Sequence, residues 1–123
     1  MKARILIVDD EELLLLSWEY TLRSAGYDVV TASEGEKAVE IAREQKPDIA
    51  ITDLIISDMS GIEVCRKIKE SSPETEVVLI SGHPEELRTR QRDFVSAGGR
   101  EEVLVKPLSK AEIIEAVEKI LNS

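Results

Sequence analysis

The chain has 123 residues, of which 42% are hydrophobic and only 3% aromatic, and it carries a formal net charge of −9 at pH 7. This length predicts a single domain, residues 1–123, whose core is built from aliphatic side chains. Because an acidic surface repels phosphate backbones and anionic lipid, nucleic acid and membranes are excluded as favoured partners, which leaves proteins and cations. The sequence opens on a strand pattern without a signal peptide, and no apolar run approaches the ~20 residues of a membrane span, so we expect a protein of the reducing cytoplasm.

Five short apolar runs rich in β-branched residues alternate along the chain with five longer segments of helical periodicity. The runs, which we expect to be strands, are residues 4–9, 28–32, 48–53, 76–81 and 102–106. The helical segments are roughly residues 12–25, 34–45, 60–71, 84–97 and 109–121. Several runs are apolar at consecutive positions, which is typical of parallel strands covered on both faces. The alternation therefore predicts the α/β class, with a doubly wound five-stranded parallel sheet.

Polar and turn-forming residues mark the ends of several of these helices. Ser33 and Ser60 are expected N-caps, and Ser109 begins an S-x-x-E capping box. Gly26 and Pro47 lie where two helices are expected to end. These signals agree with the boundaries that the hydrophobic periodicity gives.

The helical segment 12–25 carries more apolar side chains than one core-facing stripe requires. Leu14, Trp18 and Leu22 follow one another at i, i+4 and i+8 and predict the face that packs on the sheet. A second stripe, spaced i, i+3 and i+7, consists of Leu13, Leu16 and Tyr20. This stripe is expected either to tuck in part under a neighbouring loop or to form a docking surface for another protein.

Polar residues close four of the five expected strands. Asp9 and Asp10 end the first strand, Asp53 the third, Ser81 the fourth and Lys106 the fifth. An Asp at a strand end is also a common helix N-cap, but the agreement of four strand ends favours a site, since the carboxyl ends of such strands lie at one edge. Three carboxylates in one pocket repel one another unless a cation lies among them. Oxygen ligands favour a hard divalent ion, and Mg²⁺ is the expected one.

Lys106 and Ser81 extend this expected metal site into a pocket for a phosphoryl group. A divalent cation, an ammonium and a hydroxyl around one carboxylate would neutralise and hydrogen-bond the oxygens of such a dianion. Asp53 lies on the middle strand and is the expected nucleophile, while Asp9 and Asp10 on the neighbouring strand hold the ion beside it. The resulting acyl phosphate would be labile, which suits a timed signal.

These motifs resemble those of the receiver domains of two-component response regulators, and the resemblance covers the whole chain. "VDDEE" resembles the acidic pair of that family, "ITDLIISDMSG" its phosphoacceptor segment, "LISGH" its fourth-strand hydroxyl residue and "LVKP" its lysine followed by a cis-proline. The resemblance implies a flavodoxin-like sheet of order 2-1-3-4-5, with the first and fifth helices on one face. It implies that Asp53 accepts a phosphoryl group from a histidine kinase or a histidine phosphotransfer protein. It also implies that Asp10, Asp53 and the main-chain carbonyl of Ile55 ligate Mg²⁺, with Asp9 acting through water.

Two positions depart from the pattern of that family. Ser57 stands where a proline is common, which predicts a looser loop after Asp53. Val103 stands where Tyr or Phe is common, and its stiff, small side chain cannot follow a large rearrangement. We therefore expect the signal of phosphorylation to be carried mainly by the loop at Ser81 and the helix that follows it.

Positive charge in this acidic chain is concentrated at Arg88, Arg90, Arg92 and Arg100. The cluster is interpreted either as a solvated helix face or as a docking patch for an acidic partner. A movement of the preceding loop would reposition Arg88 and Arg92, one turn apart, for a partner or for a second copy of the domain, so a homodimer on phosphorylation is one expected state. His83, the only histidine, is expected either as a surface loop residue or as a neighbour of the phosphoryl pocket, and not as a phosphodonor.

Two other classes of protein share parts of this pattern. A phosphatase of the haloacid-dehalogenase type also uses an aspartyl nucleophile after a strand, but it needs a second Asp two residues later, where this chain has Ile55. A flavodoxin or a pseudo-receiver would bind without being phosphorylated. Flavodoxin is disfavoured by the four carboxylates that stand in place of a phosphate loop, and a pseudo-receiver by the retained acids and Lys106. We expect no enzyme beyond the domain's own phosphorylation and dephosphorylation, and the output domain or target is not encoded in these motifs.

Overall fold

The computed structural model describes residues 2–123. Its strands are β1 (Arg4–Val8), β2 (Asp28–Ala32), β3 (Ile49–Asp53), β4 (Glu76–Ser81) and β5 (Val103–Val105). Its helices are α1 (Glu12–Ser24), α2 (Gly35–Gln45), α3 (Gly61–Ser71), α4 (Pro84–Ser96) and α5 (Lys110–Leu121). Each element ends within about one residue of its predicted bounds, as local periodicity and turn signals allow.

The five strands form one parallel sheet in the order β2-β1-β3-β4-β5, which confirms the predicted fold class and strand order. Register brings the carboxyl ends of neighbouring strands level with one another. Val8 pairs with Thr52, Asp53 with Ile80, and Ser81 with Val105. The residues that follow these positions therefore meet at a single edge of the sheet.

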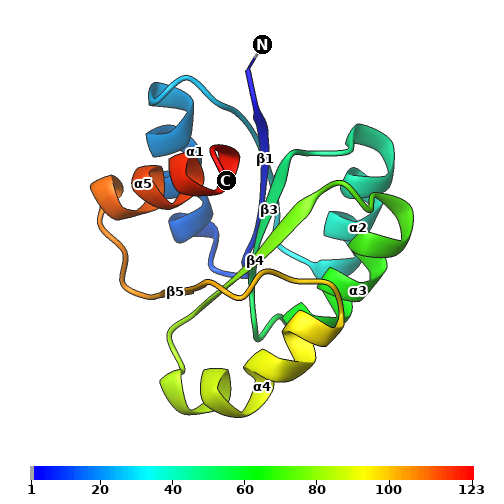
Figure 1. Cartoon of the computed structure of the whole chain (residues 1–123). Coiled ribbons are helices and arrows are strands. Elements are labelled where there is room, and N and C mark those ends of the chain that lie inside the picture. The colour runs from blue at the N-terminus through cyan, green and yellow to red at the C-terminus, as the bar shows by residue number, and fades with distance from the viewer. Residues whose placement is uncertain (1) are drawn as a thin grey trace.

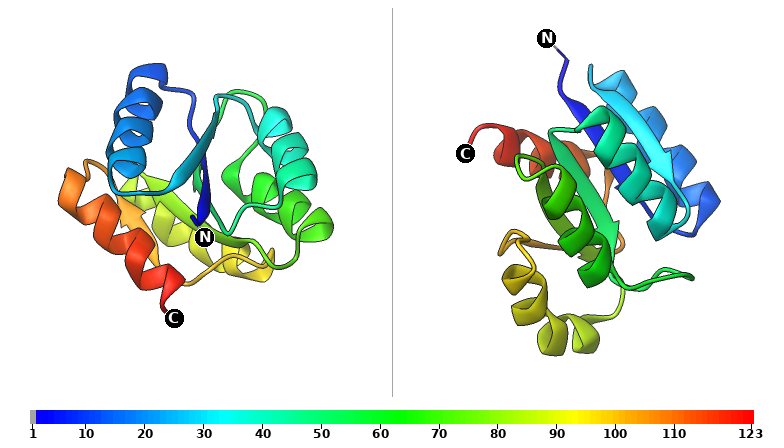
Figure 2. Two further views of the ribbon diagram at one scale, coloured as in Figure 1. Left: turned by 90° about the horizontal axis from the view of Figure 1, so that it is seen from above. Right: turned by 90° about the vertical axis from the view of Figure 1, so that its right-hand side faces the viewer.

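Helices cover both faces of the sheet, as Figures 1 and 2 show. The α1 and α5 helices pack on one face, while α2, α3 and α4 pack on the other. Strand residues alternate between the two cores: Ile5 and Ile7 face α1 and α5, whereas Leu6 and Val8 face the opposite layer. This double burial explains why the strands are apolar at consecutive positions. No helix within residues 2–123 is both long enough and apolar enough to cross a membrane.

The face of α1 that packs on the sheet differs by one residue from the predicted stripe. Trp18 and Leu22 are buried as predicted, but Leu15 is the third fully packed member, and Leu14 is only half-buried against the same core. A stripe at i, i+3 and i+7 fits 3.6 residues per turn better than one at i, i+4 and i+8. The second apolar stripe is solvent-exposed over its whole length, at Leu13, Leu16 and Tyr20.

Two of the three predicted serine caps are confirmed. The Ser60 hydroxyl accepts from the Glu63 N–H at the start of α3, and Ser109 forms the predicted capping box at the start of α5. The predicted cap at Ser33 is wrong, because the N-cap position of α2 is Glu34, whose side chain makes no capping hydrogen bond. The first amides of α2 are instead satisfied by Asp58 from a distant loop.

Candidate functional site

Four strand ends bring the predicted site residues to one edge of the sheet. Asp9 directly follows β1, Asp53 and Ser81 are the last residues of β3 and β4, and Lys106 directly follows β5. The Lys106 N–H donates to the Ser81 carbonyl over 2.9 Å, which continues the ladder between the last two strands. The parallel register explains how residues nearly a hundred positions apart come into contact.

Three carboxylates form an acidic cluster at this edge. Oxygens of Asp9, Asp10 and Asp53 lie within 4.8 Å of one another. Asp9 and Asp53 are buried, while Asp10 is exposed and leaves the cluster open to solvent. Oxygen ligands at this spacing, with one open side, fit a hard divalent cation such as Mg²⁺.

Lys106 supplies the positive charge inside the cluster. Its Nζ lies 2.7 Å from Asp9 Oδ2 and 2.9 Å from Asp53 Oδ2, and its side chain is only 15% exposed. Burial disfavours the charged ammonium, but the hydrogen bonds to Asp9 and Asp53 outweigh that effect and raise the pKa of Lys106. This lysine is therefore a fixed cation at neutral pH, held between two carboxylates.

The surroundings of Asp53 disfavour its negative charge despite this ion pair. Burial raises the pKa of Asp53, the nearby charge of Asp9 adds to that effect, and the bond from Lys106 offsets only part of it. The two oxygens of Asp53 differ in their surroundings. Oδ2 accepts from Lys106, whereas the nearest donor to Oδ1 is the Ile55 N–H at a long 3.5 Å. Oδ1 is thus the less engaged oxygen.

The loop after Asp53 requires glycine at the start of α3. The Gly61 N–H donates to the Leu54 carbonyl over 2.7 Å, and Ile55 pairs with Ser60 in an isolated antiparallel bridge. A Cβ atom on Gly61 would lie 2.2 Å from the main-chain oxygen of Asp53, so no other residue fits without moving the site. The Gly that ends the predicted phosphoacceptor segment is therefore explained by this close approach.

Ser81 is buried at the edge of the same pocket. Its hydroxyl oxygen accepts from the His83 N–H over 3.0 Å, which leaves its proton free to donate. Within residues 2–123, no hydrogen bond joins Ser81 to Asp53. His83 itself is exposed at the N-cap of α4 and makes no side-chain capping bond, so it lies in the predicted surface loop.

Two neighbours of Lys106 were not singled out from the sequence. Glu11 Oε1 lies 3.9 Å from Lys106 Nζ, and the Trp18 ring centroid lies 6.0 Å from the same nitrogen. Glu11 belongs to the same run of four carboxylates as Asp9, and this run is the feature of the sequence from which its position near Lys106 could have been predicted. Trp18 shows only helical periodicity in the sequence, so its proximity to Lys106 depends on tertiary packing that the sequence does not reveal.

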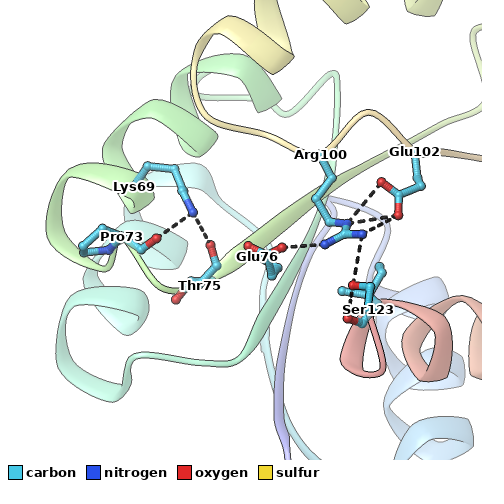
Figure 3. A network of polar contacts seen from close by, with 8 residues as sticks. Lys69, Pro73, Thr75, Glu76, Arg100, Glu102 and Ser123 are labelled. Carbon is cyan, nitrogen blue, oxygen red and sulfur yellow. Dashed lines mark hydrogen bonds and ion pairs between the residues drawn. The ribbon is translucent and has the colours of Figure 1, made fainter.

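The arginines predicted as one cluster separate into two groups. Arg88 and Arg92 are exposed on α4 and line a shallow groove with Gln91 and Glu101. Arg100 is instead largely buried in ion pairs with carboxylates at the start of β4 and before β5, as Figure 3 shows. Its hydrogen bonds to Glu102 raise the pKa of Arg100 further. Arg100 therefore holds the segment between α4 and β5 in place and is not part of a docking patch.

Residues 5–118 match the family described as the response regulator receiver domain. The chain belongs to this family. Receiver domains of response regulators are signalling proteins, and this membership confirms the predicted family. The Lys106–Pro107 peptide bond is cis, as the resemblance implied.

Curated relatives and solved structures agree with the receiver assignment. The chain is 33% identical over 122 residues to the alkaline phosphatase synthesis transcriptional regulatory protein PhoP of Bacillus subtilis, covering 99% of this chain and 50% of that protein. It is 30% identical over 119 residues to the cell cycle transcriptional regulator CtrA of Caulobacter vibrioides, covering 97% and 50%. The receiver chain thus spans about half the length of these relatives.

Solved receiver structures share the fold over nearly the whole chain. A CheY-like receiver domain from Methanospirillum hungatei superposes with a TM-score of 0.90 at 24% identity, covering 99% of this chain and 95% of that one. The beryllofluoride-activated DrrB receiver domain superposes with a TM-score of 0.82 at 27% identity and covers 100% of both chains.

Proposed function

We propose that this domain is a switch that is activated by phosphorylation of Asp53. The observation that carries the proposal is the ammonium of Lys106, held 2.7 Å from Asp9 and 2.9 Å from Asp53 in a cluster of three carboxylates. A lysine between buried carboxylates needs a reason beyond stability, because burying such charges is seldom favourable. Membership of the receiver family supplies that reason.

Asp53 is the best-placed nucleophile of the three acids. Asp9 is completely buried, and its two oxygens already accept from Lys106 and from the Glu11 N–H. Asp10 is exposed and is not among the ion-pair partners of Lys106 within residues 2–123, whereas Oδ1 of Asp53 is poorly engaged. In the proposed step this oxygen attacks phosphorus, the bond from phosphorus to the donor imidazole nitrogen breaks, and the leaving imidazole takes up a proton.

Lys106 and Ser81 would stabilise the phosphoryl group once it is on Asp53. The ammonium can move from the carboxylate to a phosphoryl oxygen without leaving the pocket, and the free Ser81 proton can be donated to another. Mg²⁺, held by Asp9, Asp10, Asp53 and the main-chain carbonyl of Ile55, would neutralise the remaining charge. The residues present fit such an ion because each offers an oxygen ligand.

Phosphorylation is tested with a small-molecule donor. We expect acetyl phosphate and Mg²⁺ to add one phosphoryl group to the intact protein, as measured by mass spectrometry, and a chelator to prevent the addition. An unmodified protein under conditions that label other receivers would refute the proposal.

Mg²⁺ is expected to raise the melting temperature of the protein, because it binds the assembled carboxylates and not the unfolded chain. Asp10→Ala removes the exposed ligand without disturbing the buried ion pairs of Lys106, so this variant should lose the response. Thermal unfolding at millimolar Mg²⁺, with K⁺ at matched ionic strength as the control, measures the effect. An unchanged wild-type melting temperature would contradict the metal site.

The proposed phosphodonor is a histidine kinase or a histidine phosphotransfer protein, which would dock on α1. Leu13, Leu16 and Tyr20 are 84%, 61% and 71% exposed on this helix, which begins three residues after Asp9. An exposed apolar stripe of this kind next to the acidic site favours a protein partner. The proposal also includes an output that phosphorylation controls, which is either a further domain or a separate target protein. It includes a homodimer that forms on phosphorylation.

Leu13→Glu is expected to slow transfer from the kinase by roughly tenfold or more, since a charge placed in an apolar interface costs at least about 1.4 kcal/mol. Labelling by acetyl phosphate should stay unchanged, because Leu13 is exposed and is not one of the residues that form the acidic cluster. Leu121→Glu, at an exposed apolar position in the last turn of α5, is the matched control. Equal losses with both donors would indicate misfolding and remove the support for docking on α1.

A further inference from the structure

The loop between β3 and α3 is closed at its base by few contacts. The isolated bridge from Ile55 to Ser60 and the bond from the Gly61 N–H to the Leu54 carbonyl join its two arms. The Ile55 N–H lies 3.5 Å from Asp53 Oδ1, a distance at which a hydrogen bond is weak. Leu54 and Ile56 are buried in the core beside these links, whereas the tip of the loop at Ser57 and Asp58 is exposed.

The tip of this loop is fastened to a different part of the molecule. Asp58 Oδ1 accepts from the Gly35 N–H over 2.8 Å, and its Oδ2 accepts from the Glu36 N–H over 3.0 Å. These two amides begin α2, and they lack a local partner because Glu34 makes no side-chain capping bond. The hydrogen bonds from the Glu36 and Gly35 amides lower the pKa of Asp58, and the bond from Glu36 has the larger effect. The carboxylate is therefore charged at neutral pH.

The start of α2 is also shaped to receive the loop. A Cβ atom on Gly35 would lie 2.4 Å from Cγ and 2.8 Å from Sδ of Met59, so a larger residue here would require the Met59 side chain to move. Met59 packs against the core on this side of the sheet. The loop tip is thus attached by two hydrogen bonds and by the close packing of Met59 against Gly35.

Ser57 does little to fix the conformation of the loop tip, so the contacts of Asp58 matter more. The residue has no ring to restrict its backbone, and its side chain is exposed. Asp58 follows it directly and is the polar side chain that joins the tip to another element. The position of the exposed loop tip therefore depends in part on hydrogen bonds to another element.

We propose that Asp58 is a positioning residue of the acidic site: by capping α2 from the loop after Asp53, it fixes the segment that carries the main-chain carbonyl of Ile55. The inference rests on the proposed function, because that carbonyl is a proposed ligand of Mg²⁺. It also couples α2 to the site, since any movement of the loop tip changes the capping of this helix.

The test compares the Mg²⁺ affinity of three variants with that of the wild type by following amide resonances of Leu54 and Ile55 during titration with MgCl₂. Asp58→Ala should weaken binding by roughly 10-fold, the lower limit for loss of an outer-shell partner. Asp58→Asn keeps one of the two acceptors and should weaken binding less. Ser109→Ala removes a cap of similar strength from α5, far from the loop, and should leave the affinity unchanged.

The matched variants separate the possible causes of an effect. Asp58→Ala and Asp58→Asn remove the same charge, so equal losses would indicate long-range electrostatics and would overturn the positioning role. Wild-type affinity in Asp58→Ala would overturn it as well. Absence of Mg²⁺ binding in the wild type would refute the proposed metal site itself, an outcome distinct from failure of the positioning role alone. If Asp58→Ala is not folded, the comparison of Asp58→Asn with the wild type decides, and equal affinity overturns the inference.

Discussion

Lys106→Ala is expected to destabilise the metal-free protein by about 3 kcal/mol, the lower part of the range for breaking a buried ion pair. The ammonium is the cation that separates Asp9 from Asp53, and both carboxylates are buried. Without it, their mutual repulsion and their burial are uncompensated. Denaturant unfolding in the presence of a chelator measures the change in the free energy of unfolding.

Mg²⁺ should restore much of the stability lost in Lys106→Ala, because the ion would enter the same cluster of carboxylates. The increase in melting temperature on adding Mg²⁺ is therefore expected to be larger in this variant than in the wild type. Lys67→Ala, at an exposed position in the middle of α3, is the matched control and should change stability little. Equal stability of the two variants without metal would show that Lys106 does not hold the site together.

Asp53→Asn is expected to abolish phosphorylation and also to stabilise the metal-free protein, by about 1 kcal/mol at neutral pH. Burial raises the pKa of Asp53 above its ordinary value, so the folded state binds the proton more tightly than the unfolded state does. The amide variant has the same shape and no charge. It keeps Lys106 paired with Asp9, so the cation is not left unpaired.

The advantage of Asp53→Asn should depend on pH in a defined direction. Below the unfolded pKa of about 3.9, Asp53 is protonated in both states and wild type and variant should be similarly stable. As pH rises through the raised pKa of the folded state, the wild type loses stability that the variant keeps. Asp93→Asn, on the exposed surface of α4, should show no such difference. A gap that shrinks towards neutral pH would contradict the burial of a charged Asp53.

The fold and the position of the site could be predicted because both depend on strong local patterns. Consecutive apolar residues in each strand required a sheet covered on two faces, and strict alternation with helices required parallel strands. Once the strands were parallel, the polar residues at their carboxyl ends had to meet. Asp9, Asp53 and Lys106 therefore came together by topology alone, although they lie far apart in the sequence.

Details that depend on tertiary contacts could not be predicted in the same way. Residues 13–16 are all leucine, so the sequence allows this helix two orientations about its own axis. Packing on the sheet buries Leu15 more deeply than Leu14. Ser33 was a plausible local cap, but Asp58, 23 positions from Gly35, supplies the acceptors instead. Arg100 appeared as one of four arginines until its contacts with Glu76 and Glu102 separated it from them.

Asp53, and neither of its two acidic neighbours, is expected to receive the phosphoryl group. After labelling with acetyl phosphate and Mg²⁺, borohydride reduction converts an aspartyl phosphate to homoserine, and peptide mass spectrometry locates the converted residue. We predict conversion at Asp53 in the wild type and none in Asp53→Asn. Conversion at Asp9 or Asp10, or undiminished labelling of Asp53→Asn, would contradict Asp53 as the phosphorylated residue.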